Sequence, residues 1–162
     1  RLPSVAGADP GGRTGQSTPN ATHLIKVAVQ TALGLRQKMD VFGTDYPTPD
    51  GTCVRDYIHV TDLVRAHLAA LAHLRAGGES MVANCGYGRG YSVQEVIDTV
   101  RKVTKVDFRA DYAPRRPGDA AAVVADPTRI KTRLGWTPSL DDLEGIVDSA
   151  YAWERRLANG RG

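Results

Sequence analysis

The chain has 162 residues, of which 41% are hydrophobic, and a formal net charge of +3 at pH 7. This length supports one compact domain, and because the basic residues are scattered, no nucleic-acid binding is expected. No apolar run approaches the roughly 18–20 residues of a membrane span, so no membrane association is expected either.

The first half of the chain is predicted to contain one helix and two strands. Residues 5–20 are dense in Gly, Pro, Ser, Thr, Asn and Asp, which predicts a loop. Apolar residues then recur at helical spacing over residues 23–35, where Asn20 or Thr22 is the expected cap. Strands are predicted at residues 39–43 and 54–60, on either side of a turn at residues 44–51.

The second half alternates helices with short strands. Thr61 is the expected cap of a helix that extends to Ala76, and His67 lies on its apolar stripe as a predicted core residue. Ser92 is the expected cap of a helix over residues 93–103. The other elements are predicted to be strands at 81–84, 107–111 and 123–125, a helix from its cap Asp126 to Leu134, and a helix at 140–157. This alternation predicts an α/β fold.

Two arginine positions are candidates for binding phosphate. Arg55 opens a predicted strand, and Arg116 follows Arg115 in a predicted loop. A guanidinium matches phosphate oxygens in a bidentate way, and a diphosphate needs more than one such donor. The carboxylate of Asp119 is able to accept hydrogen bonds from the vicinal hydroxyls of a ribose. Spacing alone does not show that these side chains converge, and each arginine taken alone is also explained as a surface or salt-bridged residue.

The glycine-rich loop at residues 84–90 allows two interpretations. It follows a predicted strand and precedes a predicted helix, as phosphate-binding loops do. Its spacing is not G-x-G-x-x-G, however, and a tight turn between two elements explains it equally well. We favour the turn.

The residues alone predict neither a metal site nor catalytic chemistry. No pair among the four histidines has metal-ligand spacing. The two cysteines, Cys53 and Cys85, are expected to be reduced thiols, which favours a cytoplasmic location. Because the sequence contains no Tyr-x-x-x-Lys, no G-x-S-x-G and no P-loop, no catalytic residue is predicted.

The run VFGTDYPTPDGTCVRDYIHVTDL, residues 41–63, resembles UDP-glucose 4-epimerases of the extended short-chain dehydrogenase/reductase superfamily. The resemblance continues upstream through VAGADPGGRTGQ and HLIKVAVQTALG, and downstream through NCGYGRGYSVQEVI, YAPRRPGDAAAVVADPTRI and LGWTPSLDDLEGIV. It therefore covers nearly the whole chain in order. On this resemblance we expect residues 1–162 to be the carboxyl-terminal, substrate-binding portion of such an enzyme, with a few strands and helices that would complete a Rossmann domain. The amino-terminal NAD-binding part is expected to be missing.

The resemblance implies an isomerase that interconverts UDP-glucose and UDP-galactose through a 4-keto intermediate. Members of the family bind NAD in an amino-terminal Rossmann domain, where a Tyr-x-x-x-Lys pair deprotonates the sugar while hydride passes to NAD. They are commonly homodimeric. For this chain alone, the resemblance implies a UDP-sugar partner but neither NAD binding nor epimerase activity.

Carried over position by position, the resemblance implies a UDP-sugar site. Arg55 and Arg116 match arginines that bind the diphosphate, and Asp119 matches the carboxylate that binds the ribose. Tyr57 matches a tyrosine of the substrate pocket. The remaining matched positions are His23 and Leu24 at the nucleotide sugar, Asp40, Val41 and Phe42 beside the uracil, and Ser4 at a substrate contact.

The chain departs from the family pattern at three places. The family usually has R-Y-F-N where this chain begins Arg1-Leu2-Pro3-Ser4, so Ser4 replaces a longer Asn and Pro3 lacks a backbone donor. Lys26 stands where Pro is common, and Val123 stands where some members have a substrate-contacting Tyr.

Three other interpretations stay open. The chain is also compatible with a non-catalytic UDP-sugar-binding fragment. It is compatible with an unstable remnant, because its elements would normally pack on the absent Rossmann sheet. It is compatible with part of another sugar-nucleotide epimerase or dehydratase.

Overall fold

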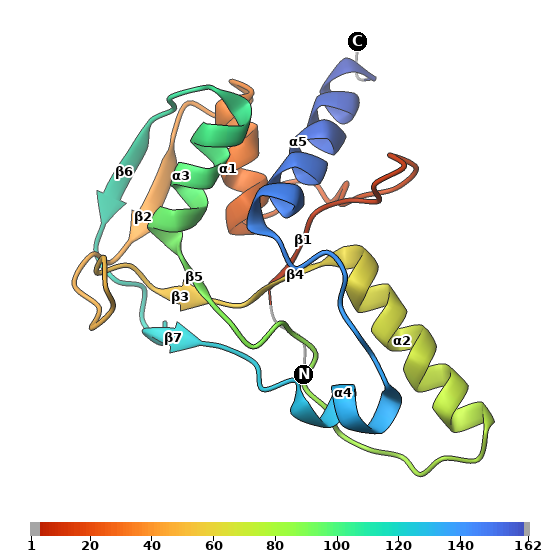
Figure 1. Ribbon diagram of the computed structural model, residues 1–162. Helices are drawn as coiled ribbons and strands as arrows, with labels where there is room; N and C mark the ends of the chain where they lie inside the picture. Colours follow the sequence, from red (N-terminus) through yellow and green to blue (C-terminus); the bar gives the residue numbers. More distant parts are fainter. Residues whose placement is uncertain (1–3, 161–162) are drawn as a thin grey trace.

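The computed structural model of the chain describes residues 4–160 and confirms the α/β prediction (Figure 1). The elements in chain order are β1 (Ser4–Ala6), α1 (Leu24–Ala32), β2 (Met39–Phe42), β3 (Val54–Arg55), β4 (Tyr57–His59), α2 (Val60–Arg75), β5 (Tyr91–Ser92), α3 (Val93–Thr104), β6 (Ala110–Ala113), β7 (Ala122–Val123), α4 (Thr128–Leu134) and α5 (Leu143–Asn159).

The strands form three small sheets rather than one. β1 pairs with β4 and β2 pairs with β6, both in parallel, whereas β3 lies between antiparallel β5 and parallel β7. Sheets of two strands are marginally stable by themselves. The helices that pack on them must therefore supply most of the stability.

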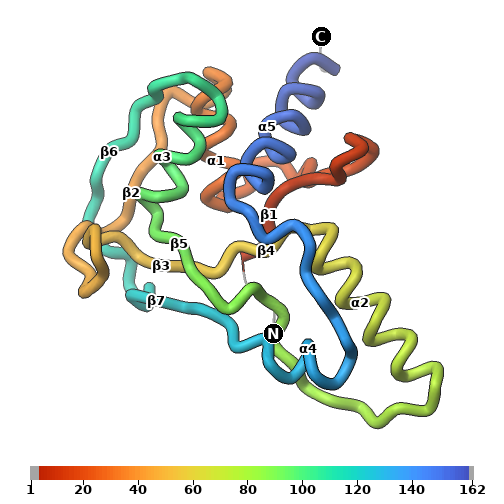
Figure 2. Tube along the Cα trace, in the orientation of Figure 1, coloured from red at the N-terminus to blue at the C-terminus, as the bar shows by residue number. Residues whose placement is uncertain are grey.

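The core lies where α1, α3 and α5 pack together, and Figure 2 shows the Cα path of these three helices side by side. α3 begins as predicted, because the Ser92 hydroxyl accepts from the Glu95 N–H and the Glu95 carboxylate accepts from the Ser92 N–H. The most buried apolar side chains of the three helices are Ala28, Val29, Val96, Ile97, Val100, Ile146 and Val147.

Asp56 divides the strand predicted at residues 54–60 into β3 and β4. Its carboxylate is buried and accepts hydrogen bonds from the backbone N–H groups of Tyr87 at 3.1 Å, Gly88 at 3.0 Å and Ala125 at 3.3 Å. A Cβ at Gly86 would lie 2.6 Å from this carboxylate, so glycine is what lets the loop close around it. The glycine-rich loop binds a protein carboxylate here, which agrees with the turn interpretation.

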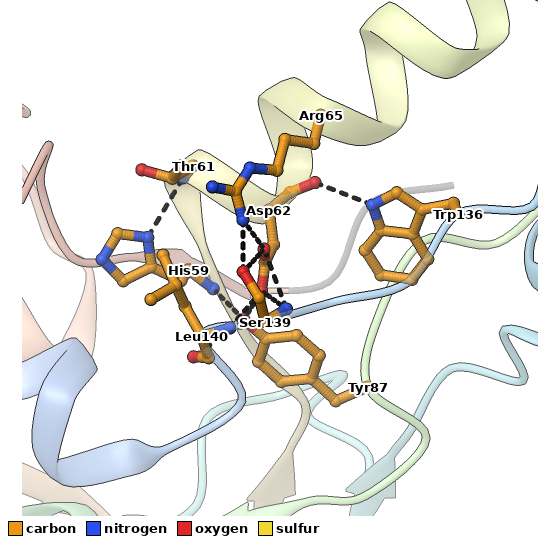
Figure 3. A network of polar contacts seen from close by, with 8 residues as sticks. All are labelled: His59, Thr61, Asp62, Arg65, Tyr87, Trp136, Ser139 and Leu140. Atoms are coloured by element: carbon orange, nitrogen blue, oxygen red, sulfur yellow. Dashed lines mark hydrogen bonds and ion pairs between the residues drawn. The ribbon is translucent and has the colours of Figure 1, made fainter.

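A second buried carboxylate, Asp62, joins α2 to the segment that leads into α5 (Figure 3). It accepts hydrogen bonds from the N–H of Leu140 at 2.8 Å, the N–H of Ser139 at 3.0 Å and the hydroxyl of Tyr87 at 2.9 Å. Trp136 donates its indole N–H to the backbone carbonyl of Asp62 at 3.0 Å. Asp62 thus fixes three segments that are far apart in the sequence.

The cap of α2 is His59, and the prediction of Thr61 is wrong. His59 Nδ1 accepts from the N–H of Thr61 at 3.1 Å, and its Nε2 lies 3.2 Å from the Ser149 hydroxyl. Burial lowers the pKa of His59, which keeps the imidazole neutral and Nδ1 available as an acceptor.

The predicted caps of α1 and α4 and the predicted start of α5 also need correction. His23 is the cap of α1, with no side-chain hydrogen bond, so neither Asn20 nor Thr22 caps it. Pro127 holds the cap position of α4, although Asp126 accepts from the N–H of Thr128 at 2.9 Å. The last helix begins at Leu143 after its cap Asp142, not at residue 140, because the N–H of Leu140 bonds to Asp62.

Several strand predictions are wrong in position. Residues 5 and 6 belong to β1 rather than to a loop, since they pair with β4. Residues 81–84 form no strand, and the strand of this region, β5, lies at Tyr91–Ser92, where it pairs with β3. The strand predicted at 107–111 lies at Ala110–Ala113, after Phe108 enters the core, and that at 123–125 lies at Ala122–Val123.

The apolar stripe predicted as the buried side of α2 is largely exposed. Leu63 and Ala66 are buried, but His67 is exposed, which contradicts its placement in the core. The other apolar side chains of the stripe are 45–59% exposed, namely Val64, Leu68, Leu71 and Leu74. We call these four side chains the α2 face.

Candidate functional site

A cavity of about 1120 Å³ is lined by residues of β1, β2, β3, β4, α5 and the amino end of α1. It exceeds the usual volume of sites for drug-sized ligands. Eight of the ten predicted site residues line it, namely Ser4, His23, Leu24, Asp40, Phe42, Arg55, Tyr57 and Arg116. Val41 and Asp119 are not among the lining residues.

The amino end of α1 offers unpaired backbone donors to this cavity. His23 holds the cap position with extended backbone, φ −66° and ψ 133°, and no side chain caps the helix. The N–H groups of Leu24, Ile25 and Lys26 therefore have no partner within the helix, whereas that of Val27 donates to the His23 carbonyl. They carry the positive end of the helix dipole, which favours an anion.

Arg55 and Arg116 converge on Asp119. Arg116 Nε donates to Asp119 Oδ2 at 2.9 Å, and Arg55 Nη2 lies 3.6 Å from Asp119 Oδ1. Arg55 also donates to the carbonyls of Val54 at 2.8 Å and Ala120 at 2.9 Å, which fixes its guanidinium. Asp119 thus holds two guanidinium groups next to each other at the cavity, as a diphosphate site requires.

β2 presents alternate side chains to the cavity and to the core. Asp40 and Phe42 line the cavity, whereas Val41 is buried, which leaves only its backbone for a ligand. The Arg116 guanidinium lies over the Phe42 ring, 4.7 Å from the centroid. Asp40 is paired with Lys38 at 2.9 Å. Within residues 4–160, β2 has one neighbouring strand, β6, so its other edge can face a planar ring.

Ser4 and Tyr57 lie opposite each other in the parallel pair of β1 and β4, and both line the cavity. The phenol of Tyr57 is buried, and burial raises its pKa well above the usual value. The Tyr57 hydroxyl therefore stays neutral and is able to donate as well as accept a hydrogen bond.

The three departures from the family pattern lie in different parts of the structure. Lys26 lines the cavity. Val123 is 53% exposed on β7 and is not a lining residue. Pro3 lies outside the described residues, while Ser4 is partly buried on β1.

Some cavity residues come from distant segments and have no local signal in the sequence. Gln16 lies in the predicted loop, whereas Trp153 and Glu154 belong to α5. No local pattern connects the final helix to the loop, so only the folded chain brings these side chains together. Arg36 and Lys38 also line the cavity.

The part of the chain that the structure describes contains no cluster of three or more His, Cys, Asp or Glu side chains that could hold a metal ion. No helix between residues 4 and 160 is long and apolar enough to cross a membrane.

Comparison with known proteins decides the family. Residues 10–148 match the family model described as GDP-mannose 4,6 dehydratase. The chain belongs to this family. Among curated members, a UDP-glucose 4-epimerase of Azospirillum brasilense is 59% identical over 159 residues, which cover 98% of this chain and 46% of the relative.

Solved structures of family members agree with this assignment. A crystal structure of a UDP-glucose 4-epimerase matches with a TM-score of 0.93 and 48% identity, covering 96% of this chain and 47% of the other. The Bifidobacterium longum UDP-glucose 4-epimerase in complex with NAD+ and UDP matches with a TM-score of 0.91 and 37% identity, covering 99% of this chain and 48% of the other. The chain therefore spans about half the length of the relatives it matches. The expected resemblance is confirmed, and the chain corresponds to the carboxyl-terminal portion of an extended short-chain dehydrogenase/reductase.

Proposed function

We propose that this chain is the portion of a UDP-glucose 4-epimerase that holds the UDP moiety of the substrate. The observation that carries the proposal is the convergence on one cavity of Arg55, Arg116 and the uncapped amino end of α1. Each of these groups suits a phosphate, and two phosphates need several such donors. The similarity to an epimerase solved with UDP supports the choice of nucleotide.

The other site residues take roles that follow from their positions. Phe42 and the free edge of β2 are suited to the flat uracil ring. Asp119 orders the two arginines and has lone pairs left for ribose hydroxyls. Tyr57 and Ser4 offer neutral hydroxyls to the sugar. Binding energy from the nucleotide would keep the substrate in place while its sugar turns over between UDP-glucose and UDP-galactose.

NAD, when bound, supplies the hydride acceptor of such an epimerase, but the described residues do not fit it. The N–H groups of Tyr87 and Gly88 in the glycine-rich loop already bind the Asp56 carboxylate. The 162 residues contain no Tyr-x-x-x-Lys pair. We therefore assign NAD and the hydride chemistry to the amino-terminal portion of such enzymes.

The α2 face is the proposed contact with that amino-terminal portion. Exposed apolar patches of this kind mark interfaces, and Val64 belongs both to the face and to the cavity wall. The relatives are about twice as long as this chain. Their other half is therefore large enough to cover the α2 face. The parallel pair β1–β4 lies beside α2, and parallel strands are normally covered or extended by further elements.

We also propose that the assembled enzyme acts in the cytoplasm. Cys53 and Cys85 are both free and buried, as expected of a protein kept in a reducing compartment. Homodimeric assembly, which is common in the family, is proposed for the assembled enzyme only.

Mixing this chain with the separately produced amino-terminal portion of the Azospirillum brasilense relative tests the proposal. We expect the two to elute together from a sizing column and to convert UDP-galactose to UDP-glucose, whereas this chain alone shows no turnover. Leu68→Lys should abolish co-elution because it buries a charge in the α2 face, while Leu35→Lys, at an exposed leucine after α1, should not. Turnover by this chain alone would contradict the proposal.

A non-catalytic UDP-sugar-binding protein is the second candidate. The retention of the phosphate-binding groups without a catalytic pair favours it. The same mixture decides between the two, because this candidate predicts UDP binding without any gain of turnover.

A further inference from the structure

A buried ion pair connects α1 to α5 at the wall of the cavity. Lys26 and Glu154 are in direct contact, and their side chains are 7% and 6% exposed. The second carboxylate oxygen of Glu154 accepts from the Gln30 side chain at 3.0 Å. A buried pair of this kind is weak evidence for stability alone, because desolvation offsets most of the attraction. The contacts that it makes with its surroundings are therefore more informative.

The pair fixes the loop residue Gln16. Lys26 Nζ donates to the Gln16 carbonyl at 2.9 Å, and the indole N–H of Trp153 donates to the same oxygen at 3.2 Å. The neighbouring Gly15 lies against the indole, since a Cβ there would be 2.6 Å from the ring atoms of Trp153. Two donors from two helices thus hold one carbonyl of an otherwise exposed loop.

Gln16 in turn contacts the imidazole ring of His23. Its side-chain nitrogen lies 2.8 Å from His23 Nδ1. An amide nitrogen only donates, so Nδ1 must accept, and the proton of the neutral ring is on Nε2. His23 caps α1 and lines the cavity with Gln16, Lys26 and Glu154.

We infer that Lys26 and Glu154 are positioning residues that act through Gln16 to hold His23 as the Nε2–H tautomer, a single hydrogen-bond donor for an oxygen of the bound nucleotide sugar. The identity of the ligand rests on the proposed function, whereas the tautomer of His23 does not depend on it. The contact with Gln16 also gives a role to Lys26 at a position where the family resemblance leads us to expect Pro.

The tautomer is measured on the full chain with ¹⁵N-labelled histidine at pH 8, where an unperturbed imidazole is neutral. The signal of His23 is identified by its loss in His23→Asn. We expect a protonated Nε2 and an unprotonated Nδ1 in the unchanged chain. Gln16→Ala and the double variant Lys26→Met, Glu154→Met should instead give a mixture of tautomers and a UDP-glucose Kd raised roughly three- to tenfold. The double variant leaves no unpaired charge, which protects folding.

The matched control is the double variant Lys102→Met, Glu144→Met. That ion pair also connects α5 to a neighbouring helix, but it is solvent-exposed and does not line the cavity. It should change neither the tautomer nor the Kd. A mixture or an Nδ1–H tautomer in the unchanged chain would overturn the inference, as would an unchanged tautomer in the Lys26→Met, Glu154→Met variant. If UDP-glucose does not bind the unchanged chain, the proposed function fails while the tautomer still decides the inference.

Discussion

Replacing Asp62 by alanine is expected to lower the free energy of unfolding by about 3–5 kcal/mol, the largest effect of any single change that we predict. The substitution leaves the N–H groups of Ser139 and Leu140 without their buried acceptor and removes one of the two acceptors of the Tyr87 hydroxyl. Small domains are stable by only about 5–15 kcal/mol, so much of the fold's stability depends on this carboxylate. Urea denaturation followed by circular dichroism measures the change.

Asp148→Ala is the matched control, because Asp148 is an exposed aspartate on α5. It should change the free energy of unfolding by no more than about 0.5 kcal/mol. Asp62→Asn should lie between the two variants, since an amide keeps one acceptor oxygen but adds two donors. Equal stability of Asp62→Ala and Asp148→Ala would show that the network in Figure 3 does not hold α2 to the segment before α5.

Replacing Arg116 by alanine is expected to weaken UDP binding by about 1.5–3 kcal/mol, the contribution of a hydrogen bond to a charged group. The change removes one of the two guanidinium groups held by Asp119 and the stacking on Phe42. The fold should stay intact, because Arg116 is exposed. Isothermal calorimetry with UDP measures the loss.

Arg115 provides the control for Arg116. It precedes Arg116 directly and is also stacked on an aromatic ring, that of Tyr46 at 4.2 Å, but it does not line the cavity. Arg115→Ala should therefore leave UDP affinity unchanged. An equal loss in both variants would indicate general attraction by positive charge, and no loss in Arg116→Ala would remove this residue from the site.

The helices were the most predictable part of the fold. Apolar spacing and the Ser92–Glu95 pair located α3 closely, because both signals are local. Strand positions were less predictable, since pairing partners decide them. Residues 81–84 have the pattern of a buried strand, yet the strand of this region that pairs with β3 lies at Tyr91–Ser92. The periodicity of α2 predicts an apolar stripe, but it does not show what covers that stripe. The α2 face was therefore predicted to lie in the core, although it is exposed.

The candidate site residues came from the family resemblance, because spacing alone does not require their side chains to converge. Arg55, Arg116 and Phe42 line one cavity, whereas the binding of a UDP-sugar there stays a prediction. The pairing of Lys26 with Glu154 had no signal in the sequence, because 128 positions separate the two residues. Asp56 and Asp62 were missed as buried acceptors for the same reason, since their donors lie on remote loops.

An NMR titration of the ¹⁵N-labelled chain with UDP tests the proposed UDP-binding site most directly. We expect saturable shifts of the backbone amides of His23, Leu24, Asp40, Phe42 and Arg116, with no comparable change at Leu68, Leu71 and Leu74 of the α2 face. An absence of shifts at millimolar UDP, or shifts confined to α2 and α4, would contradict it.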